Sequence, residues 1–497
     1  MDSLVPATRR RARAADARSM TVIVSTLLSS VLLLLGTGLH PVAWLTWLGP
    51  LPVLWLAPRV GGRAAFAAAS LAWLAGQSRM WPYYLGTLKM PPPAAAGIIV
   101  GTALVFGVLA LAFRRLLLRG FPLVAALTVP AGWAALEYAL SLTAPHGAWL
   151  SLAYTQADVP PVVQTASLTG PWGITFLVMG VPAAVAAPAA PGAARRWRVL
   201  LAAALVLVLP LAYGGWRLRQ PHDPSRATVT LLDTDRPDDT IDLATPQGRD
   251  LLHRYLTAIR ATAPARAVVL PEKTFAADET TLPALTGPVA RLAAERHEDI
   301  VAGLVLTTAG TARNAALGIR ADGGPPVLYF KHHMIPGLED GLAPGSDLAF
   351  LSPGRGLVIC KDLDFPGLVR AYRARGATVL YAPAWDFTGD GRLHGRMALV
   401  RGVESGLSVA RAARAGTLVV SDPYGRVLAG RATGGPGFTS VTAALPVRGV
   451  RTVYSRFGDW FAWLCALLLV AGLSGTSLIY RRCAADAATA TADPMTA

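Results

Sequence analysis

Long apolar runs, separated by short polar or basic segments, make up most of the chain before residue 220. A helix needs about 20 mostly apolar residues to cross a bilayer. We therefore expect about seven transmembrane helices before residue 220 and one more after residue 455. The runs cover residues 21–39, 42–56, 64–81, 94–113, 121–142, 173–190, 199–216 and 460–480.

The basic residues between these runs predict how the helices are oriented. Arginine clusters occur at every second boundary, at residues 9–13, 59–63, 114–119, 195–198 and 481–482. Because positive charge stays on the cytoplasmic side, both termini are expected in the cytoplasm and residues 217–457 outside it. The first run could instead be a signal peptide, but further apolar runs follow it at once, which favours a transmembrane helix.

The composition agrees with a membrane protein. The chain has 497 residues, of which 53% are hydrophobic and only 15% are charged, and its mean hydropathy is +0.43. A net charge of +16 could indicate a nucleic-acid partner. However, many of the arginines flank apolar runs instead of gathering on one domain, so we expect a lipid bilayer and no nucleic acid.

One acidic residue, Glu137, lies within the predicted transmembrane runs. A carboxylate inside a membrane is a candidate functional group, because its burial is costly unless it is used. The alternative is a structural role, in which Glu137 pairs with a neighbour near the outer end of its helix.

The hydrophobic pattern changes after residue 226. Short β-branched runs, such as residues 227–232 and 267–270, predict strands, and residues 247–263 carry leucines on one face of an expected helix. Strands mixed with helices in this way predict an α/β domain over residues 226–445. The complete expected order is a basic segment (1–20), a membrane domain (21–216), the α/β domain (226–445), a last transmembrane helix (457–480) and a tail (481–497).

Three chemically active side chains follow apolar runs inside this α/β domain. They are Glu272, Lys331 and Cys360. Strand ends of one sheet can bring such residues together, and the three side chains then form an acyl-transfer site. Glu272 would take the thiol proton, the Cys360 thiolate would attack a carbonyl, and Lys331 would stabilise the oxyanion and lower the pKa of the thiol.

Each of these residues also has a structural alternative. Cys360 could be a small core residue, since free cysteine is often buried, and Glu272 and Lys331 could be a structural ion pair. Asp362 and Asp364 could cap a loop. His332 and His333 make a poor pair of metal ligands, because neighbours on a strand face opposite sides. No CxxC or HExxH spacing is present, so we expect no metal site.

The same residues resemble the signatures of the carbon–nitrogen hydrolase (nitrilase) superfamily, in the expected order. The matching segments are LPE ending at Glu272, YFK ending at Lys331 and VIC ending at Cys360. With the flanking apolar runs, the chain resembles the apolipoprotein N-acyltransferases, which are membrane-embedded members of that superfamily. Residues 147–156, 170–174, 331–339 and 454–460 also resemble segments of these enzymes.

The resemblance implies a multi-pass α-helical membrane domain joined to a nitrilase-like αββα sandwich. It implies Glu272, Lys331 and Cys360 as the catalytic residues, with Glu339, Asp362 and Trp385 in supporting positions and no cofactor. It also implies that Cys360 takes a fatty acyl group from a phospholipid as a thioester. The acyl group would then pass to the α-amine of a diacylated lipoprotein, on the outer side of a bacterial cytoplasmic membrane.

Two other functions remain open at the level of sequence. The segments around Pro336 and Trp385 depart from the family pattern, which favours a membrane-tethered amidase for another carbon–nitrogen substrate. The α/β domain could also be a non-catalytic binding module, although Glu272, Lys331 and Cys360 are all retained. Attack by water instead of an amine would distinguish the amidase from the acyltransferase.

Overall fold

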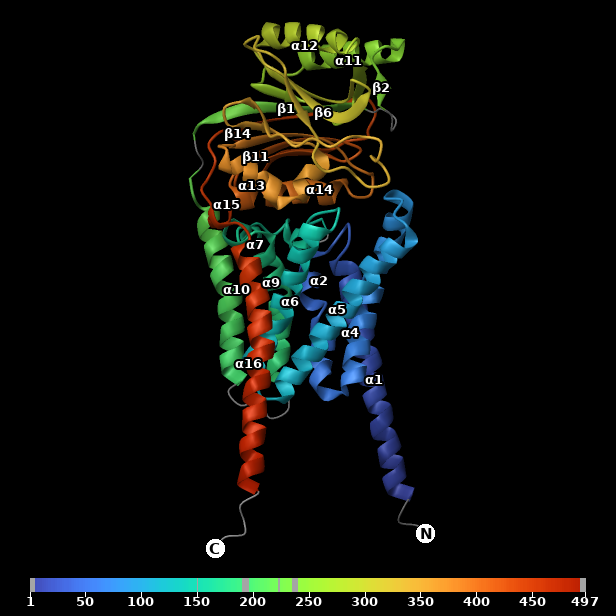
Figure 1. Ribbon diagram of the computed structural model, residues 1–497, viewed down its shortest axis with the longest axis vertical. Helices are drawn as coiled ribbons and strands as arrows, with labels where there is room; N and C mark the ends of the chain where they lie inside the picture. The colour runs from blue at the N-terminus through green and yellow to red at the C-terminus, as the bar shows by residue number, and fades with distance from the viewer. Residues whose placement is uncertain (1–4, 150, 190–195, 222–223, 235–239, 492–497) are drawn as a thin grey trace.

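The computed structural model describes residues 5–149, 151–189, 196–221, 224–234 and 240–491. Figure 1 shows two parts stacked along the long axis of the molecule. We call them the helical half (residues 5–221 and 453–491) and the α/β half (residues 224–446). This confirms the predicted fold class. Residues 1–4 of the expected basic segment, Arg195 and residues 492–497 of the expected tail lie outside the described residues.

The helical half is a bundle in which successive long helices pack side by side. α1 contacts α4, α4 contacts α5, α5 contacts α6, α6 contacts α9 and α9 contacts α10, while the last helix, α16, returns to pack on α6. The helices are α1 (Val5–Gly36), α2 (Ala43–Leu48), α3 (Leu51–Leu56), α4 (Gly62–Gly76), α5 (Pro92–Leu118), α6 (Pro122–Thr143), α7 (Pro160–Val163), α8 (Ala166–Thr169), α9 (Pro171–Ala186), α10 (Arg196–Leu218), α15 (Val453–Phe457) and α16 (Trp460–Thr491).

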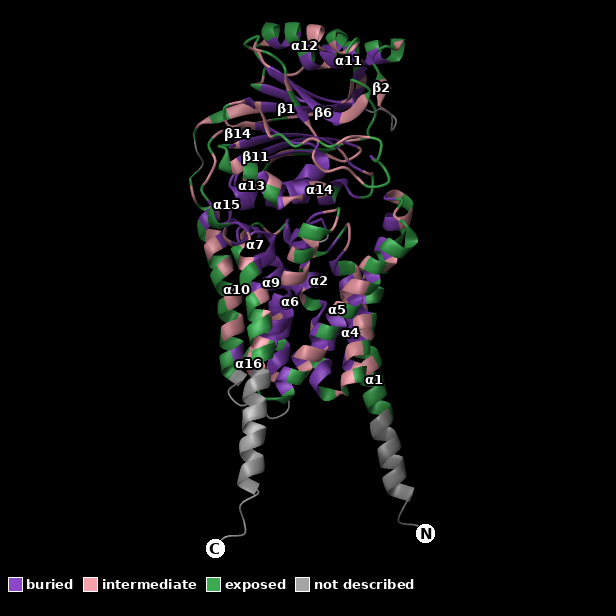
Figure 2. Ribbon diagram, in the orientation of Figure 1, coloured by how far each residue is buried: buried purple, intermediate pink, exposed green. Residues whose placement is uncertain are grey.

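The outer faces of this bundle are apolar and exposed. Leu27, Leu104, Leu209 and Leu467 point away from the protein interior, and Figure 2 shows exposed residues along the outside of α10, α16 and α1. Leucines in these positions suit a hydrocarbon environment. Within the described residues, four helices are long and apolar enough to cross a membrane: 16–36, 92–118, 122–143 and 197–218. The expected count of seven spans before residue 220 stays a prediction.

The sequence suggested one continuous helix over residues 42–56, but the structure does not form one. It forms two helices of six residues, α2 and α3, which meet at Gly49 and Pro50. Proline lacks a backbone donor and disfavours a helical residue before it. Ser29 of α1 partners the backbone at this break, donating to the Gly49 carbonyl (2.7 Å) and accepting from the Val53 amide (3.3 Å). Each short helix rises only about 9 Å, so neither α2 nor α3 can cross a bilayer by itself.

Glu137 has a structural role in the helical half. Its carboxylate is buried and accepts hydrogen bonds from Trp133 Nε1 (3.0 Å), Ser151 Oγ (2.7 Å), Thr175 Oγ1 (2.7 Å) and the Leu152 amide (2.9 Å). These four donors compensate the burial of the charge. They also hold the loop after α6, which leads to the active-site region, against α6 and α9.

The α/β half contains two sheets. Sheet A has the strand order β14 (Phe438–Pro446), β1 (Arg226–Thr234), β3 (Ala267–Val269), β5 (Asp299–Thr308), β4 (Phe275–Asp278) and β2 (Ile241–Asp242), with β6 (Thr311–Ile319) beside β5 and β7 (Val327–Phe330) beside β6. Sheet B has the order β13 (Val427–Ala432), β12 (Thr417–Ser421), β11 (Ser408–Arg414), β10 (Val379–Trp385), β9 (Arg355–Leu357) and β8 (Ala349–Ser352).

Helices cover the outer face of each sheet, so the layers run α–β–β–α (Figure 1). α11 (Pro246–Ala261) and α12 (Leu282–Arg296) lie on sheet A, at the end of the molecule furthest from the helical half. α13 (Pro366–Ala374) and α14 (Gly391–Ser405) lie on sheet B and face the helical half. Apolar residues of β1, β3 and β9–β12 form the core between the sheets.

The first and last strands of the α/β half are neighbours. β1 and β14 pair antiparallel along their whole length, with Arg226 opposite Pro446. The chain therefore enters and leaves this half at one place, beside the ends of α10 and α15.

Several elements differ from the sequence prediction. The sequence predicts a helix over residues 288–296, but α12 begins earlier, at Leu282, and β4, β8 and β13 were not predicted. These strands have four to six residues and lack a clear apolar alternation, so their sheet neighbours determine them more than their own sequence does.

Candidate active site

Glu272 lies at a break between two parallel strands. β3 pairs with the first part of β5 and β4 with the second part, and residues 270–274 turn between them. Gly303 allows this turn to pack directly against the backbone of β5. A Cβ at residue 303 would lie only 2.3 Å from the Pro271 carbonyl oxygen and 2.6 Å from Glu272 Cα. The Glu272 amide donates to the Ala384 carbonyl of sheet B (3.2 Å). The buried Glu272 carboxylate is thus fixed between the two sheets.

Lys331 follows β7 directly and is fully buried. Its Nζ lies between two carboxylates, 2.8 Å from Glu272 Oε1 and 2.7 Å from Glu339 Oε2. Burial disfavours the charge of Lys331, but the two carboxylates outweigh burial and hold the pKa of Lys331 well above its usual value. Lys331 is therefore a cation, and the expected ion pair with Glu272 is present.

Glu339 is the second carboxylate that the family resemblance implied. Burial disfavours its charge, but Lys331 and Lys273 lower the pKa of Glu339 to about 2. Lys273 Nζ contacts Glu339 Oε1 at 2.9 Å, and the Ile335 amide donates to Oε2 (3.0 Å). Glu339 is thus a charged group that holds the Lys331 ammonium in place.

Asn314 connects the two carboxylates and was not singled out from the sequence. Its Nδ2 donates to Glu272 Oε1 (2.6 Å) and to Glu339 Oε1 (2.9 Å). The sequence carried one signal for it: Asn314 is a polar residue in the run that forms β6, and it points inward. Lys273 was also missed, because it looked like an ordinary surface lysine after Glu272.

Cys360 begins the 3₁₀ helix η6 (Cys360–Asp364), three residues after β9 ends. Its φ of +42° lies in the left-handed region, which costs a non-glycine residue about 1–3 kcal/mol and is typical of functional positions. The thiol contacts the Trp385 carbonyl oxygen at 3.5 Å. This tight turn directs the Cys360 side chain away from the strand.

Lys331 lowers the pKa of the thiol, as expected, but other groups determine the net shift. Burial raises the pKa of the Cys360 thiol well above its usual value, and the charge of Glu272 raises it further, while Lys331 only opposes this. The resting group is therefore a thiol, and a nucleophilic attack by it would require a base.

Asp362 holds the loop that carries Cys360, as the loop-cap alternative suggested. Its carboxylate accepts from the amides of Ile359 (3.1 Å), His332 (3.2 Å) and His333 (3.1 Å). Tyr329 Oη also donates to it (2.7 Å). Asp362 thus ties the loop after Lys331 to the loop of Cys360.

Trp385 lies at the end of β10, beside the thiol. Two cations flank its ring: the Arg414 guanidinium at 3.8 Å and Lys273 Nζ at 4.9 Å from a ring centroid. Next to it, Asp386 accepts from Arg411 in a buried two-point ion pair, with one bond of 2.8 Å. These contacts fix the backbone carbonyl that faces Cys360.

The comparisons with known proteins agree with this geometry. Residues 29–184 match the family described as apolipoprotein N-acyltransferase N-terminal domain, and residues 188–452 match carbon-nitrogen hydrolase. The chain belongs to the carbon–nitrogen hydrolase family. The match before residue 185 identifies it more narrowly with the membrane-embedded apolipoprotein N-acyltransferases, as the sequence predicted.

Individual relatives cover most of the chain. An apolipoprotein N-acyltransferase of Geobacter metallireducens is 26% identical over 88% of this chain and 92% of its own length. One of Gloeobacter violaceus is 27% identical over 95% of this chain and 98% of its own. Among solved structures, an amidase from Nesterenkonia sp. AN1 is similar over 49% of this chain and 98% of its own, with 19% identity and a TM-score of 0.40.

In this member of the family, both halves of the chain line the cavity at Cys360. We call it the Cys360 cavity; its empty volume is about 370 Å³. The α/β half contributes Cys360, Lys361, Trp385, His394 and three further residues, and the helical half contributes Tyr83, Leu88, His146 and Trp149. The site is thus complete only when the two halves are together.

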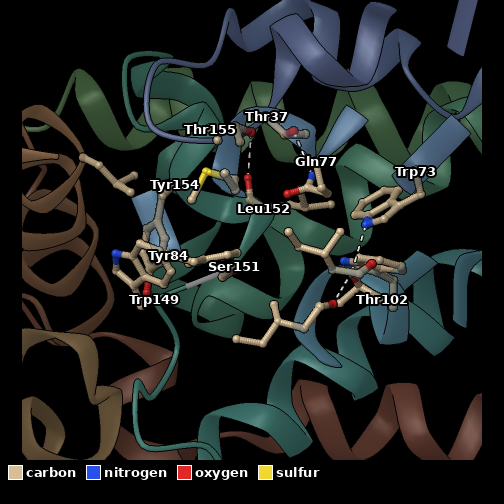
Figure 3. A pocket seen from close by; sticks show the side chains of 16 residues that line it. Thr37, Trp73, Gln77, Tyr84, Thr102, Trp149, Ser151, Leu152, Tyr154 and Thr155 are labelled. Atoms are coloured by element: carbon tan, nitrogen blue, oxygen red, sulfur yellow. Dashed lines mark hydrogen bonds between the residues drawn. The ribbon is translucent and has the colours of Figure 1, made fainter. Parts of the chain in front are cut away.

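Two cavities of the helical half adjoin the Cys360 cavity. One has an empty volume of about 650 Å³ and shares Trp149 with it; Figure 3 shows Trp149 beside Tyr84 there, with Gln77 hydrogen-bonded to Thr37 and Trp73 to Thr102. The other, the α5–α6 groove, has an empty volume of about 1,210 Å³ and shares His146 with the Cys360 cavity. Most of its lining is apolar, from Met90 and Ala94 to Leu136 and Leu140.

Asp386, Asp390 and His394 bring three possible metal ligands within 4.8 Å of one another. Their charges are already matched by other groups. Arg411 pairs with Asp386, and Tyr83 of the helical half donates to Asp390. Burial disfavours the His394 cation, but Asp390, Asp386 and Asp364 raise the pKa of His394 to about 9. The cluster therefore works as an ion-pair network that joins the two halves.

Proposed function

We propose that this protein is an N-acyltransferase that transfers a fatty acyl group from a membrane phospholipid to the free α-amine of the N-terminal diacylglyceryl-cysteine of lipoproteins. Several relatives carry the name apolipoprotein N-acyltransferase. The observation that supports the acyl donor best is the apolar α5–α6 groove, which shares His146 with the Cys360 cavity.

The groove suits an acyl chain for energetic reasons. Moving an acyl chain from the bilayer into water costs about 0.8 kcal/mol for each CH₂ group. A route lined by apolar residues between α5 and α6 avoids that cost. At the junction, burial lowers the pKa of His146 to about 4, so His146 is neutral near pH 7 and places no charge in the path of the chain.

In the first half-reaction, Glu272 takes the thiol proton as Cys360 Sγ attacks the ester carbonyl carbon. The negative charge that develops on the carbonyl oxygen is stabilised by the Lys331 ammonium and a backbone amide. The bond to the glycerol oxygen then breaks, this oxygen takes the proton from Glu272, and lysophospholipid leaves. The acyl group remains on Cys360 as a thioester.

In the second half-reaction, the acceptor amine attacks the thioester carbon. Glu272 accepts a proton from the amine and returns it to the Cys360 sulfur as the carbon–sulfur bond breaks. One ester is consumed, and one amide and one alcohol form. Neither half-reaction needs an oxidant or a reductant.

We also propose that both termini lie in the cytoplasm and the α/β half outside it, at the surface of the bacterial cytoplasmic membrane. The arginine clusters at alternate ends of the apolar runs support this orientation. The outer location would give the site access to lipoproteins after export.

The test is the intact mass of the purified protein after incubation with phospholipid. We expect wild type to gain one fatty acyl group and to lose it when a diacylated lipopeptide with a free α-amine is added. Cys360→Ala should gain nothing, whereas Cys465→Ala, which removes a buried thiol of α16, should behave as wild type. No adduct on wild type would refute the proposal. An adduct lost equally fast without lipopeptide would favour the membrane-tethered amidase.

A further inference from the structure

A polar cleft lies behind Trp385, next to the Cys360 cavity. Its empty volume is about 1,020 Å³, and Arg414, which stacks on the Trp385 ring, is part of its wall. Trp385 itself lines the Cys360 cavity. One stacked pair of side chains therefore separates the two spaces.

One segment of the chain lines both spaces. Phe387 and His394 face the Cys360 cavity, whereas Thr388 and Arg392 line the polar cleft. The cleft is also bounded by His40, in the turn between α1 and α2 of the helical half. It thus lies where the two halves meet.

The chemistry of the cleft differs from that of the α5–α6 groove. Its lining includes a carboxylate (Asp233), guanidinium groups (Arg392 and Arg414) and hydroxyl groups such as those of Thr388 and Thr433. Such a lining gives no favourable place to an acyl chain. Arg392 already pairs with Asp158 (3.0 Å), and the Arg414 guanidinium lies over the Trp385 ring, so both cations of the lining already have partners other than a phosphate-bearing headgroup.

The lining favours a polypeptide. Gly434 is among its residues and is exposed, and a glycine exposes its backbone because no side chain covers it. Charges of both signs, hydroxyl groups and accessible backbone can bind the amides of a peptide whatever its side chains are. A site of this kind accepts many sequences.

We propose that the polar cleft binds the polypeptide that follows the acylated cysteine of the acceptor, as a second part of the acceptor site. This inference rests on the proposed function. An extended chain spans about 3.3 Å for each residue, so about three to six residues would lead from the Cys360 thioester past Trp385 into the cleft.

The test compares two acceptors on the same acyl-enzyme. One is a diacylated cysteine with a single following residue, and the other carries ten following residues. We expect wild type to acylate the longer acceptor faster at low concentration. Thr388→Trp, which places a large side chain in the cleft from an exposed position, should lower the ratio of long to short transfer rates about tenfold, which corresponds to about 1.4 kcal/mol.

Thr257→Trp makes the same change at an exposed position of α11, at the opposite end of the α/β half (Figure 1), and should keep the wild-type ratio. A ratio in Thr388→Trp equal to that of wild type would overturn the proposal. The proposal would also be overturned if Thr388→Trp slowed acyl-enzyme formation by an amount that depends on the phospholipid headgroup, since the cleft would then bind the donor. Failure of wild type to form any acyl-enzyme would instead refute the proposed function.

A second measurement does not depend on a variant. A lipopeptide with a photoreactive residue at the fifth position after its cysteine should crosslink to the segments around Thr388 and Thr433. Crosslinks confined to residues of the α5–α6 groove would contradict a peptide site in the cleft.

Discussion

At the scale of single residues, the site is a charge-balanced cluster, with Glu272 and Glu339 as anions and Lys331 and Lys273 as cations. Asn314 adds no charge, yet it donates to both carboxylates through one nitrogen atom. Asn314 therefore acts as a positioning residue, because it sets the separation of the two carboxylates and the direction of the Glu272 oxygen that would accept the thiol proton.

We predict that Asn314→Ala slows acyl-enzyme formation by roughly ten- to a hundredfold, since a hydrogen bond to a charged group is worth about 1.5–3 kcal/mol. Asn314→Asp should be slower still, because it adds a third anion to the cluster. The rate of mass gain on Cys360 measures both. A purely structural role would be indicated if both variants lost thermal stability but kept the wild-type rate per folded molecule.

At the scale of elements, α14 fastens the α/β half to the helical half. Leu393, Met397 and Val400 of α14 belong to the same apolar core as the helical half. The His394 cation, near the start of the helix, lies against Asp390 and Asp386. The position of α14 therefore depends on packing and on the protonation of one histidine.

This arrangement predicts a pH-dependent stability. The pKa of His394 is raised from 6.5 to about 9. The contribution of the His394 cation to the free energy of unfolding is therefore fully present below pH 6.5 and is lost as the pH rises through about 9. The shift corresponds to at most about 3 kcal/mol. The pKa of Asp364 is raised by burial from 3.8 to about 6, so its contribution to stability changes with pH only between these two values, below the range of the His394 effect.

We expect the melting temperature of the detergent-solubilised protein to fall between pH 6.5 and 9.5. This fall should be much smaller in His394→Asn. His253→Asn, which changes an exposed histidine of α11, serves as the matched control and should keep the wild-type fall. Equal falls in all three proteins would exclude His394 as the cause.

At the scale of the whole molecule, the reaction space has walls from both halves and openings of opposite character. The α5–α6 groove is apolar and lies among helices of the helical half, while the polar cleft lies at the junction with the α/β half. A donor chain and an acceptor peptide could therefore reach Cys360 by separate routes.

Filling the groove should act on the donor chain. Gly101 lines the groove, and a Cβ there would meet no atom within 4 Å, so Gly101→Leu would project into open space. We predict about tenfold slower acyl-enzyme formation from a phospholipid with long chains and a smaller effect with short chains, since each CH₂ contributes about 0.8 kcal/mol. Gly215→Leu on α10, where a Cβ is equally unobstructed, should form acyl-enzyme at the wild-type rate with both the long-chain and the short-chain phospholipid. Equal slowing with both donors would contradict this route.

The sequence was most informative where a candidate catalytic residue follows an apolar run. Lys331 comes directly after β7, and Glu272 and Cys360 each lie three residues beyond a strand, so the buried strands marked all three positions. The order of these segments and the alternating arginines then indicated the two halves and the family.

Other features depend on contacts between distant segments, which hydrophobic periodicity does not record. Asn314 gains its role only when β6 lies beside residues 272 and 339. The direction of the Cys360 pKa shift depends on how completely the fold buries the thiol, because burial outweighs the lowering of the pKa by the nearby lysine. The break between α2 and α3 was visible as Gly49 and Pro50, but the apolar residues around it outweighed that signal.

The pairing of β1 with β14 has a consequence for how the protein is made. Because Arg226 lies opposite Pro446, the α/β half is a closed insertion between α10 and α15, and its two ends meet without help from α16. Ends that lie close together let an inserted domain fold as a unit. Translation supplies α16 after the α/β half, so this helix can pack on α6 only after the whole insertion has been synthesised. During biogenesis the contact between α16 and α6 therefore forms only after the ribosome has made the whole α/β half.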